Sequence, residues 1–306
     1  MTDSRTALVT GADQPLSRAL VQGLAARMRP ADQVLANGRD AERVFDATES
    51  VASGARSRSR VEGWILDVAD VDSVFERAHE LRTRYGALDV VISGAVGAPE
   101  PRDSEIDHAD DFIDITNIAT HAMLRAFAPV LRPGSCFAVV VGAPGHLSPR
   151  LQNLFDGASL EQVEYAVESW RSALHLRTAR EAGWPARLAI PATVAQVAAV
   201  RAVAAERRAR DTADGTLIMA VWPDATRVSA SQDPHSERPP WNARGSRGSR
   251  TRPGPGRVCL PGPLRRTGPV GGGRALVRRR PTVRVEPVPE PLKQGLSPRT
   301  QCRAST

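Results

Sequence analysis

The chain of 306 residues is poor in cysteine and has one lysine, Lys293. Its three cysteines, Cys136, Cys259 and Cys302, are scattered, and no C-x-x-C occurs. The sequence therefore indicates neither a disulfide framework nor a zinc site. The six histidines show no metal-ligand spacing either. This pattern fits a reducing compartment, and we expect a cytoplasmic location.

Long apolar runs and a secretory leader are also missing from the sequence. Residues 1–10 lack a basic region followed by a long apolar run, so we expect no signal peptide. No apolar stretch approaches the roughly 18 residues needed to cross a bilayer. On these grounds we expect no membrane partner.

The composition of the chain changes near residue 231. Residues 231–306 contain 15 Arg and one Lys against four acidic residues, a net charge of +12. The whole chain carries +7, so the first 230 residues carry about −5. The same stretch holds 13 of the 24 prolines and 10 of the 24 glycines, with Trp241 as its only aromatic residue. Such a stretch cannot bury enough apolar surface to offset its ordering entropy. We expect a single folded domain over residues 1–230 and a disordered tail over residues 231–306.

Strand-like and helix-like segments alternate along the first 222 residues. Strands are expected at Thr6–Thr10, Gln33–Ala36, Trp64–Leu66, Leu88–Ile92, Cys136–Val141 and Leu217–Trp222. Helices are expected at about Asp111–Leu131, at about Ala192–Ala209, and after a capping box formed by Ser159 and Gln162. This alternation predicts an α/β fold with a doubly wound parallel sheet of the Rossmann type.

A dinucleotide-binding turn is expected directly after the first strand, where the sequence reads Thr10-Gly11-Ala12-Asp13-Gln14-Pro15-Leu16-Ser17. A helix N-terminus at this place can receive a pyrophosphate, and glycines allow the backbone to approach it closely. Only Gly11 is present. Pro15 is acceptable in the first helical turn, whereas Ser17 adds a side chain that we expect to narrow the phosphate site.

This turn and three later stretches resemble the short-chain dehydrogenase/reductase family, whose turn reads T-G-x-x-x-G-x-G. Asn37-Gly38-Arg39 follows the second strand, where NADPH-preferring members place an Arg on the 2′-phosphate. Asp67-Val68 ends the third strand at the family's adenine contact, and residues 88–95 resemble L-D-x-L-V-N-N-A-G. The resemblance covers about residues 5–230. It implies an NADPH site, preferred over NADH, built from Gly11, Asp13, Leu16, Arg39, Asp67, Val68, Ser93, Gly94 and Ala95.

Two of these residues also have simpler interpretations. Arg39 taken alone fits a solvated loop charge, and Asp67 fits an N-terminal cap of the following helix. Their occurrence together at the ends of neighbouring strands favours a nucleotide site.

The segment from Ser148 to Pro185 resembles the long insertion of the family's carbonyl reductase branch. The resemblance implies NADPH-dependent reduction of a carbonyl group, with a bulky ketone or a quinone as the small-molecule substrate. In this family a Tyr protonates the forming alkoxide, a Lys four residues later lowers its pKa, and a Ser and an Asn complete the set. Such reductases often act in secondary metabolism.

These catalytic positions are substituted in the present sequence. Counted from Gly183-Trp184-Pro185, the Tyr position falls at Ala189 and the Lys position at Thr193. The Ser position falls at Val141 or Gly142, and the Asn position at Thr116, with Asn117 adjacent. Neither of the two tyrosines, Tyr85 and Tyr165, has a Lys four residues on.

Two interpretations therefore remain open for the activity. One is an enzyme that uses another proton donor, such as His146 or Ser148 after the fifth strand. The other is a non-catalytic relative that binds a nucleotide or a partner. Composition and motifs do not determine the oligomeric state.

The tail after Ser231 departs from the family pattern. Pro223-Asp224-Ala225-Thr226-Arg227 still resembles the family's P-G-x-V-x-T, with Asp224 in place of Gly, but the seventh strand that should follow is not found. We hypothesise that residues 231–306 are an out-of-frame reading of GC-rich DNA. A basic nucleic-acid-binding tail is the rival interpretation, and the lack of aromatic residues for stacking argues against it.

Overall fold

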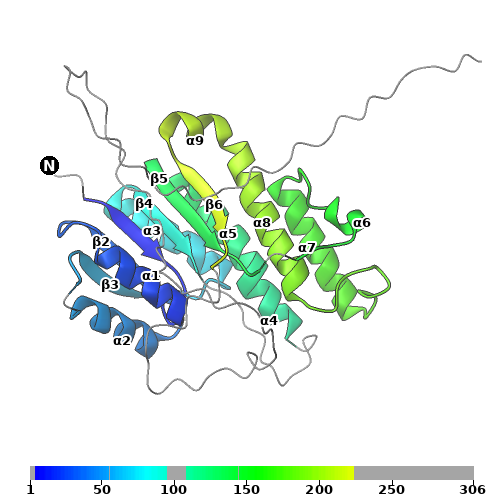
Figure 1. Ribbon diagram of the computed structural model, residues 1–306, viewed down its shortest axis with the longest axis horizontal. Helices are drawn as coiled ribbons and strands as arrows, with labels where there is room; N and C mark the ends of the chain where they lie inside the picture. The colour runs from blue at the N-terminus through cyan, green and yellow to red at the C-terminus, as the bar shows by residue number, and fades with distance from the viewer. Residues whose placement is uncertain (1–3, 55, 95–107, 144, 224–306) are drawn as a thin grey trace, which may run out of the picture. The chain divides into compact units, whose positions relative to one another are not determined.

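A computed structural model of the protein describes residues 4–54, 56–94, 108–143 and 145–223. Ala95 and the tail expected after residue 230 lie outside these described residues. The strands form one six-stranded sheet in the order β3-β2-β1-β4-β5-β6, and every neighbouring pair is parallel (Figure 1). Their bounds are β1 Thr6–Val9, β2 Gln33–Gly38, β3 Arg60–Ile65, β4 Leu88–Ser93, β5 Leu131–Val140 and β6 Leu217–Val221. The predicted doubly wound, Rossmann-like fold is confirmed.

Helices connect successive strands and form two layers. Their bounds are α1 Pro15–Ala25, α2 Ala41–Ala52, α3 Val71–Tyr85, α4 Ala109–Ile113, the π-helical turn η1 Asp114–Ile118, α5 Ala119–Phe127, the 3₁₀ turn η2 Ala128–Val130, α6 Pro149–Gln152, α7 Leu160–His175, α8 Ala189–Glu206 and α9 Arg208–Asp214. Helices α1 and α2 contact each other and β2, whereas α3, α5 and α8 are neighbours in a second layer. The strand order reverses between β1 and β4, which is where an open α/β sheet binds its ligands.

Three predicted elements differ clearly from the structure. The third strand begins at Arg60 rather than Trp64, because residues 60–65 pair in register with β2. The fifth strand begins at Leu131 rather than Cys136. The helix expected at Asp111–Leu131 is interrupted by the π-helical turn η1, and a π turn often marks a functional position.

Side-chain caps fix the starts of three helices. Asp40 accepts a hydrogen bond from the Arg43 N–H at the start of α2, and Asp70 does the same for α3. At α7 the predicted capping box is present, with both hydrogen bonds between Ser159 and Gln162 formed. Each cap satisfies backbone donors that would otherwise have no partner, which is worth about 1 kcal/mol.

Helix α8 corrects the expectation that no apolar stretch approaches 18 residues. It is 18 residues long and apolar enough, by length and composition, to cross a membrane. Ala192, Ala195 and Ala199 on this helix are fully buried, and α8 packs against α5, α7 and β6. Its apolar composition is therefore explained by its place in the protein core.

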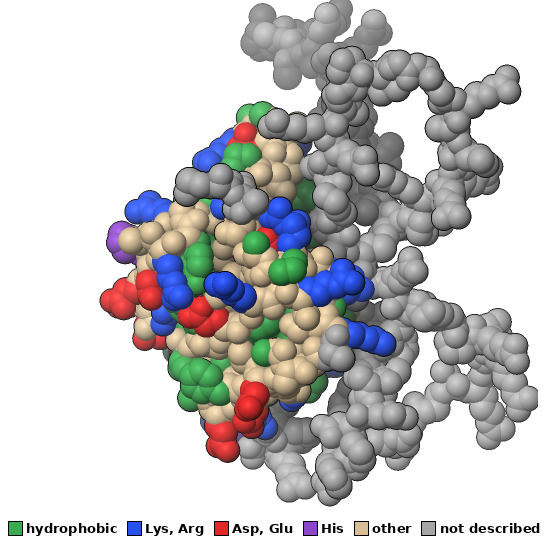
Figure 2. Space-filling view, turned by 90° about the vertical axis from the view of Figure 1, so that its left-hand side faces the viewer, with side chains coloured by type: hydrophobic (Ala, Val, Ile, Leu, Met, Phe, Trp, Pro, Cys, Tyr) green, Lys and Arg blue, Asp and Glu red, His purple; other side chains and the backbone are tan. Residues whose placement is uncertain are grey.

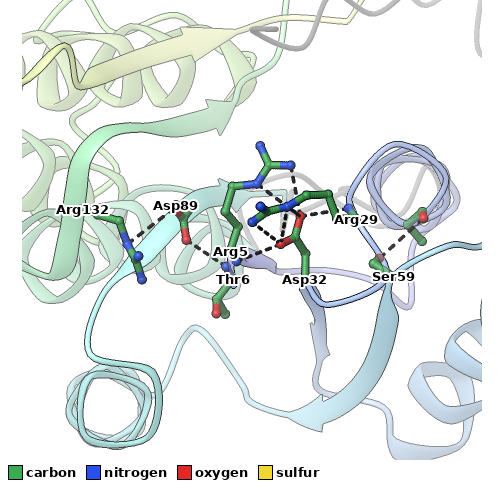
Figure 3. A network of polar contacts seen from close by, with 8 residues as sticks. Arg5, Thr6, Arg29, Asp32, Ser59, Asp89 and Arg132 are labelled. Atoms are coloured by element: carbon green, nitrogen blue, oxygen red, sulfur yellow. Dashed lines mark hydrogen bonds and ion pairs between the residues drawn. The ribbon is translucent and has the colours of Figure 1, made fainter. Parts of the chain in front are cut away.

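The amino ends of the strands are held by charged side chains (Figure 3). The Asp32 carboxylate is fully buried and accepts hydrogen bonds from the backbone N–H and guanidinium groups of both Arg5 and Arg29. Asp89 accepts from the Thr6 N–H at 2.8 Å, and its other oxygen lies 3.5 Å from Nε of Arg132. Figure 2 shows the side of the molecule that carries β3, where positive and negative side chains are interspersed with small, separate hydrophobic groups.

Candidate functional site

The turn after β1 lies where the sheet order reverses, and it has the backbone shape that the sequence predicted. Gly11 has φ of 72°, a conformation that strongly favours glycine. The Ala12 N–H donates to the Asn37 carbonyl at 2.7 Å, and the Gln14 N–H donates to the Gly11 carbonyl at 2.9 Å. The turn is thus tied to the end of β2, and α1 begins at Pro15.

Ser17, which was expected to narrow the phosphate site, lies between α1 and the end of β4. Its side chain is fully buried, and its hydroxyl donates to the Gly94 carbonyl at 3.3 Å. The Gly94 N–H in turn donates to Oγ1 of Thr10 at 3.1 Å. A Cβ atom added at Gly94 would lie only 2.3 Å from Oγ of Ser17. Ser17 therefore packs between α1 and the end of β4, because its position on α1 faces the sheet.

Two side chains of opposite charge, Arg39 and Asp13, lie at the end of β2. Arg39 is exposed, as a residue reaching for a phosphate must be. The Asp13 carboxylate lies over Gly38, since a Cβ added there would be 2.8 Å from Oδ1 of Asp13. In dinucleotide-binding folds an acidic group at this strand end binds the ribose 2′-hydroxyl, whereas an Arg accommodates a 2′-phosphate. The structure brings both kinds of group to one place.

Asp67 does not cap the helix that follows it. It is exposed and accepts a hydrogen bond from the Ala69 N–H at 3.0 Å, while Asp70 caps α3. The capping interpretation is therefore wrong, and Val68 beside it is buried. A cavity of about 280 Å³ adjoins Asp67, but the rest of its lining comes from Ile65, Leu66 and α3 and includes none of the other predicted nucleotide residues.

Asn37 is a residue of this region whose side chain the sequence did not single out. It is fully buried at the end of β2, and neither atom of its amide has a hydrogen-bond partner within the described part of the chain. Leaving such a group unpaired costs about 1–3 kcal/mol. Of the other predicted residues, Ser93 is buried at the end of β4 and Leu16 is partly exposed in the first turn of α1.

The positions predicted for the family's Tyr and Lys both lie at the start of α8. Ala189 is the first residue of α8 and is exposed. Thr193 follows one turn later and is buried, and its Oγ1 lies 2.8 Å from a Cβ atom added at Gly142. The Thr193 hydroxyl thus occupies the space that a side chain at residue 142, one of the two candidate Ser positions, would fill. The other candidate, Val141, is buried.

The predicted Asn position lies in the π-helical turn η1. Thr116 and Asn117 are both buried, and Nδ2 of Asn117 donates to the Ala192 carbonyl on α8 at 3.0 Å. Asn117 is therefore the residue whose side chain reaches α8, which favours the one-residue shift considered from the sequence. Oγ1 of Thr116 and Oδ1 of Asn117 have no hydrogen-bond partner among the described residues.

Gln196 extends this polar contact between η1 and α8. Its amide nitrogen donates to the Thr116 carbonyl at 2.9 Å and lies 3.0 Å from the Thr120 hydroxyl. In the sequence, a single glutamine in an Ala/Val-rich helix is the signal that points to this contact. The buried polar cluster formed by Thr116, Asn117, Thr120 and Gln196 holds amides and hydroxyls but no group that is a strong acid, and the buried Thr193 hydroxyl on α8 is no stronger.

The alternative donors lie on the segment after β5. His146 is exposed and Ser148 is the residue before α6, also exposed. Tyr165 is 78% exposed on α7, and Tyr85 lies at the C-terminal end of α3. Burial raises the pKa of Tyr85, and the negative charge of Glu62 acts in the same direction. Neither tyrosine lies on α8.

Comparisons with known proteins agree with this geometry. The sequence model of the short chain dehydrogenase family matches residues 5–135. Carbonyl reductase (NADPH) 1 of Sus scrofa is 27% identical over 201 residues, which cover 60% of this chain and 64% of that protein. Carbonyl reductase (NADPH) 3 of Homo sapiens is 27% identical over 199 residues, covering 60% and 67%. The matched region is thus less than two thirds of the Sus scrofa protein.

Two plant reductases have the same fold. Salutaridine reductase from Papaver somniferum superposes with a TM-score of 0.60 at 16% identity, covering 72% of this chain and 86% of that one. Menthone neomenthol reductase from Mentha piperita gives 0.59 at 19% identity, covering 72% and 89%. The family match over residues 5–135, the similarity to the carbonyl reductases and the shared fold together support a carbonyl reductase-like relationship to the short-chain dehydrogenase/reductase family.

Proposed function

We propose that this protein binds NADPH at the carboxyl ends of β1 to β4 and uses it to reduce a quinone-type carbonyl. The observation that carries the nucleotide part is the exposed Arg39, which lies at the end of β2 next to the positive-φ turn at Gly11. An exposed guanidinium at this strand end suits a 2′-phosphate, which NADH lacks. The relatives named as NADPH carbonyl reductases support the same choice of cofactor.

The described residues fit the adenosine end of NADPH better than its pyrophosphate. Arg39 and Asp67 are both exposed at neighbouring strand ends, as contacts with an adenosine phosphate require. At the turn, Pro15 removes one N–H donor from the start of α1, leaving Leu16 and Ser17 to provide the first donors. We therefore expect weaker pyrophosphate binding than a turn with three glycines provides.

The choice of a quinone follows from the groups that surround the catalytic positions. When bound, NADPH supplies a hydride, and the carbonyl oxygen that receives the electrons must then be protonated. An alkoxide needs a positioned acid, and hydroxyls such as Thr193 are too weak to serve at neutral pH. A reduced quinone leaves a phenolate, whose charge is delocalised over the ring and whose conjugate acid has a pKa of about 10, so it forms without a positioned acid and is protonated later in solvent. The amide of Asn117 and the hydroxyl of Thr193 can donate hydrogen bonds but need not transfer a proton.

A non-catalytic, nucleotide-binding role is the second candidate. Ala189 and Thr193 at the start of α8 favour it, because neither can act as an acid. The two proposals share the NADPH site and differ in whether NADPH is consumed. We further propose a cytoplasmic location, which is consistent with the free, buried thiol of Cys136.

Thermal unfolding with NADPH and NADH tests the nucleotide site. A ligand that binds only the folded state adds about 2.7 kcal/mol of stability at a hundredfold excess over Kd. We expect a rise in Tm with NADPH, a smaller rise with NADH, and loss of the difference in Arg39→Ala. Arg43→Ala, which removes a nearby exposed arginine on α2, is the matched control. Equal shifts with both nucleotides in the unchanged protein would contradict the NADPH preference.

Absorbance at 340 nm then separates the two functions. With menadione as a quinone and acetophenone as a ketone, we expect NADPH consumption with menadione alone, and its loss in Arg39→Ala. A protein whose Tm rises with NADPH but which consumes none with either compound is the non-catalytic relative.

A further inference from the structure

The two outer edges of the sheet differ in how they are protected against pairing with another strand. β3 and β6 are the outermost strands of the described sheet (Figure 1). β3 carries Arg60 and Glu62, and Glu62 lies 3.3 Å from the guanidinium of Arg84. β6 reads Leu-Ile-Met-Ala-Val and has no charged residue. Charged side chains on an edge strand oppose its pairing with other strands, so the β6 edge lacks a protection that β3 has.

The backbone of β6 offers hydrogen-bonding groups on its outer side. The Val221 carbonyl accepts a hydrogen bond from the Val141 N–H at 2.9 Å, so Val221 directs its backbone polar groups toward β5. Successive residues of a strand direct these groups to alternate sides, and Ile218 and Ala220 therefore direct theirs away from β5. Within the described part of the chain β6 pairs with β5 alone, so the outward N–H and C=O groups have no strand partner there.

The exposure of the β6 side chains is symmetric about Met219. Leu217 is 47% exposed and Val221 is 40% exposed, and the three residues between them are partly buried. Ile218 and Ala220 pack against the core, so Leu217, Met219 and Val221 project from the other face of the strand. An exposure pattern that is the same in both directions is matched by an identical strand that runs antiparallel. Such self-matching is the property of a twofold interface.

We propose that β6 pairs antiparallel with β6 of a second copy of this chain, about a twofold axis at Met219. In this register Ile218 and Ala220 of the second copy lie opposite each other and exchange their outward hydrogen bonds. Leu217 then lies opposite Val221 of the second copy, at a position without hydrogen bonds, where side chains of paired strands are closest. The exposed apolar side chains of both copies thus cover each other. The inference does not depend on the proposed nucleotide site.

Sedimentation velocity of the full chain over a roughly hundredfold range of concentration tests for the dimer. A single pair of short strands buries a small area, and interfaces below about 1,200 Å² are typical of weak complexes. We therefore expect a monomer that converts to a dimer as the concentration rises. Phe75→Lys, a change of an exposed aromatic residue on α3, should leave this equilibrium unchanged. A mass of one copy at every concentration overturns the proposal, as does loss of the dimer in Phe75→Lys.

Two double variants of the same exposed positions test the register. Leu217→Lys with Val221→Glu places opposite charges across the twofold axis, whereas Leu217→Lys with Val221→Lys places like charges there. Opposite charges stabilise a cross-strand pair and like charges destabilise it, so we expect dimerisation to be about tenfold weaker in the second variant. Equal dimerisation of the two variants overturns the proposal.

Ala220→Pro tests the outward hydrogen bonds without changing any charge. Proline is tolerated on an edge strand where its nitrogen faces away from the neighbouring strand, so the pairing of β6 with β5 should remain. We expect this variant to keep its Tm at low protein concentration and to dimerise at least tenfold more weakly in the same sedimentation experiment. A folded Ala220→Pro variant that dimerises like the unchanged protein overturns the proposal.

Discussion

The two halves of the carboxyl edge of the sheet differ in what their side chains can do. In the β1–β3 half, Arg39 and Asp67 are exposed and charged, next to the positive-φ Gly11. In the β4–β6 half, Asn117 and Gln196 are buried and hydrogen-bonded between η1 and α8. The first half presents groups to a ligand, whereas the second mainly satisfies its own polar atoms. Under the proposed function, the first half would hold the nucleotide, while the second half offers hydrogen bonds but no acid.

Restoring the acid in the β4–β6 half is expected to have the largest effect. Ala189→Tyr combined with Thr193→Lys places a phenol on the exposed first residue of α8 and an amine one turn later. A positioned acid contributes typically 10²–10⁴-fold to a rate. We expect acetophenone reduction to rise by about 10²-fold or more, measured as NADPH consumption. Ala189→Phe with Thr193→Met is the matched control and should stay inactive. No gain in a folded variant that binds NADPH would show that more than the acid is missing.

We expect the stability of the β1–β3 half to depend on the buried carboxylate of Asp32 at the amino ends of its strands. Asp32→Ala leaves the Arg5 and Arg29 backbone N–H groups without their acceptor and should lower the free energy of unfolding by about 3 kcal/mol. We use the lower end of the usual range because both arginine side chains are partly exposed. Urea unfolding measures the change in free energy. Asp89→Asn, at the amino end of β4, is the control variant in the β4–β6 half. An equal loss in both variants would contradict a special role for Asp32.

The same carboxylate predicts a pH dependence of stability. Burial alone raises the pKa of Asp32, but the hydrogen bonds from Arg29 and Arg5 outweigh it and hold the pKa well below its usual value. A depressed folded-state pKa stabilises the protein above the unfolded-state pKa of about 4 and less so as the pH falls below it. We expect the unfolding free energy of the unchanged protein to fall below about pH 4. Asp32→Ala should show a shallower fall.

The contact between the two halves tolerates no side chain at Gly94. A Cβ there would lie 2.3 Å from Oγ of Ser17 and 2.8 Å from the Thr10 carbonyl oxygen. We expect Gly94→Ala to lower the unfolding free energy by about 2 kcal/mol, within the range for overpacking. Adding Ser17→Gly should recover only part of the loss, since the Thr10 contact remains. Full recovery would show that Ser17 alone limits the space.

The smallest expected effect concerns the acidic side chain beside Arg39. The Asp13 carboxylate lies over Gly38 and should repel a 2′-phosphate. We expect Asp13→Asn to tighten NADPH binding about threefold and to leave NADH binding unchanged or slightly weaker, measured by titration at low salt. A tighter NADH complex instead would place Asp13 away from the 2′ position.

The sequence by itself determined the order of the elements, the glycine turn and the capping box of Ser159 and Gln162. Each of these features depends on residues close together in the sequence. The spacing of apolar and capping residues is therefore enough to predict them. It also placed the substituted family positions at the start of α8, because the motif Gly183-Trp184-Pro185 lies only a few residues before them.

Only the tertiary structure decided where side chains from distant segments meet. Ser17 fills the space over Gly94, 77 residues away, and the Thr193 hydroxyl lies over Gly142. Likewise, His121 is buried beside a groove lined mainly by α3, α5 and α7, and its ring nitrogens have no hydrogen-bond partner among the described residues. Such contacts depend on how the strands pair and the helices pack, which local patterns do not contain. The tertiary structure therefore decided that Ser17 is a packing residue, that Asn117 rather than Thr116 reaches α8, and that His121 is buried beside a groove.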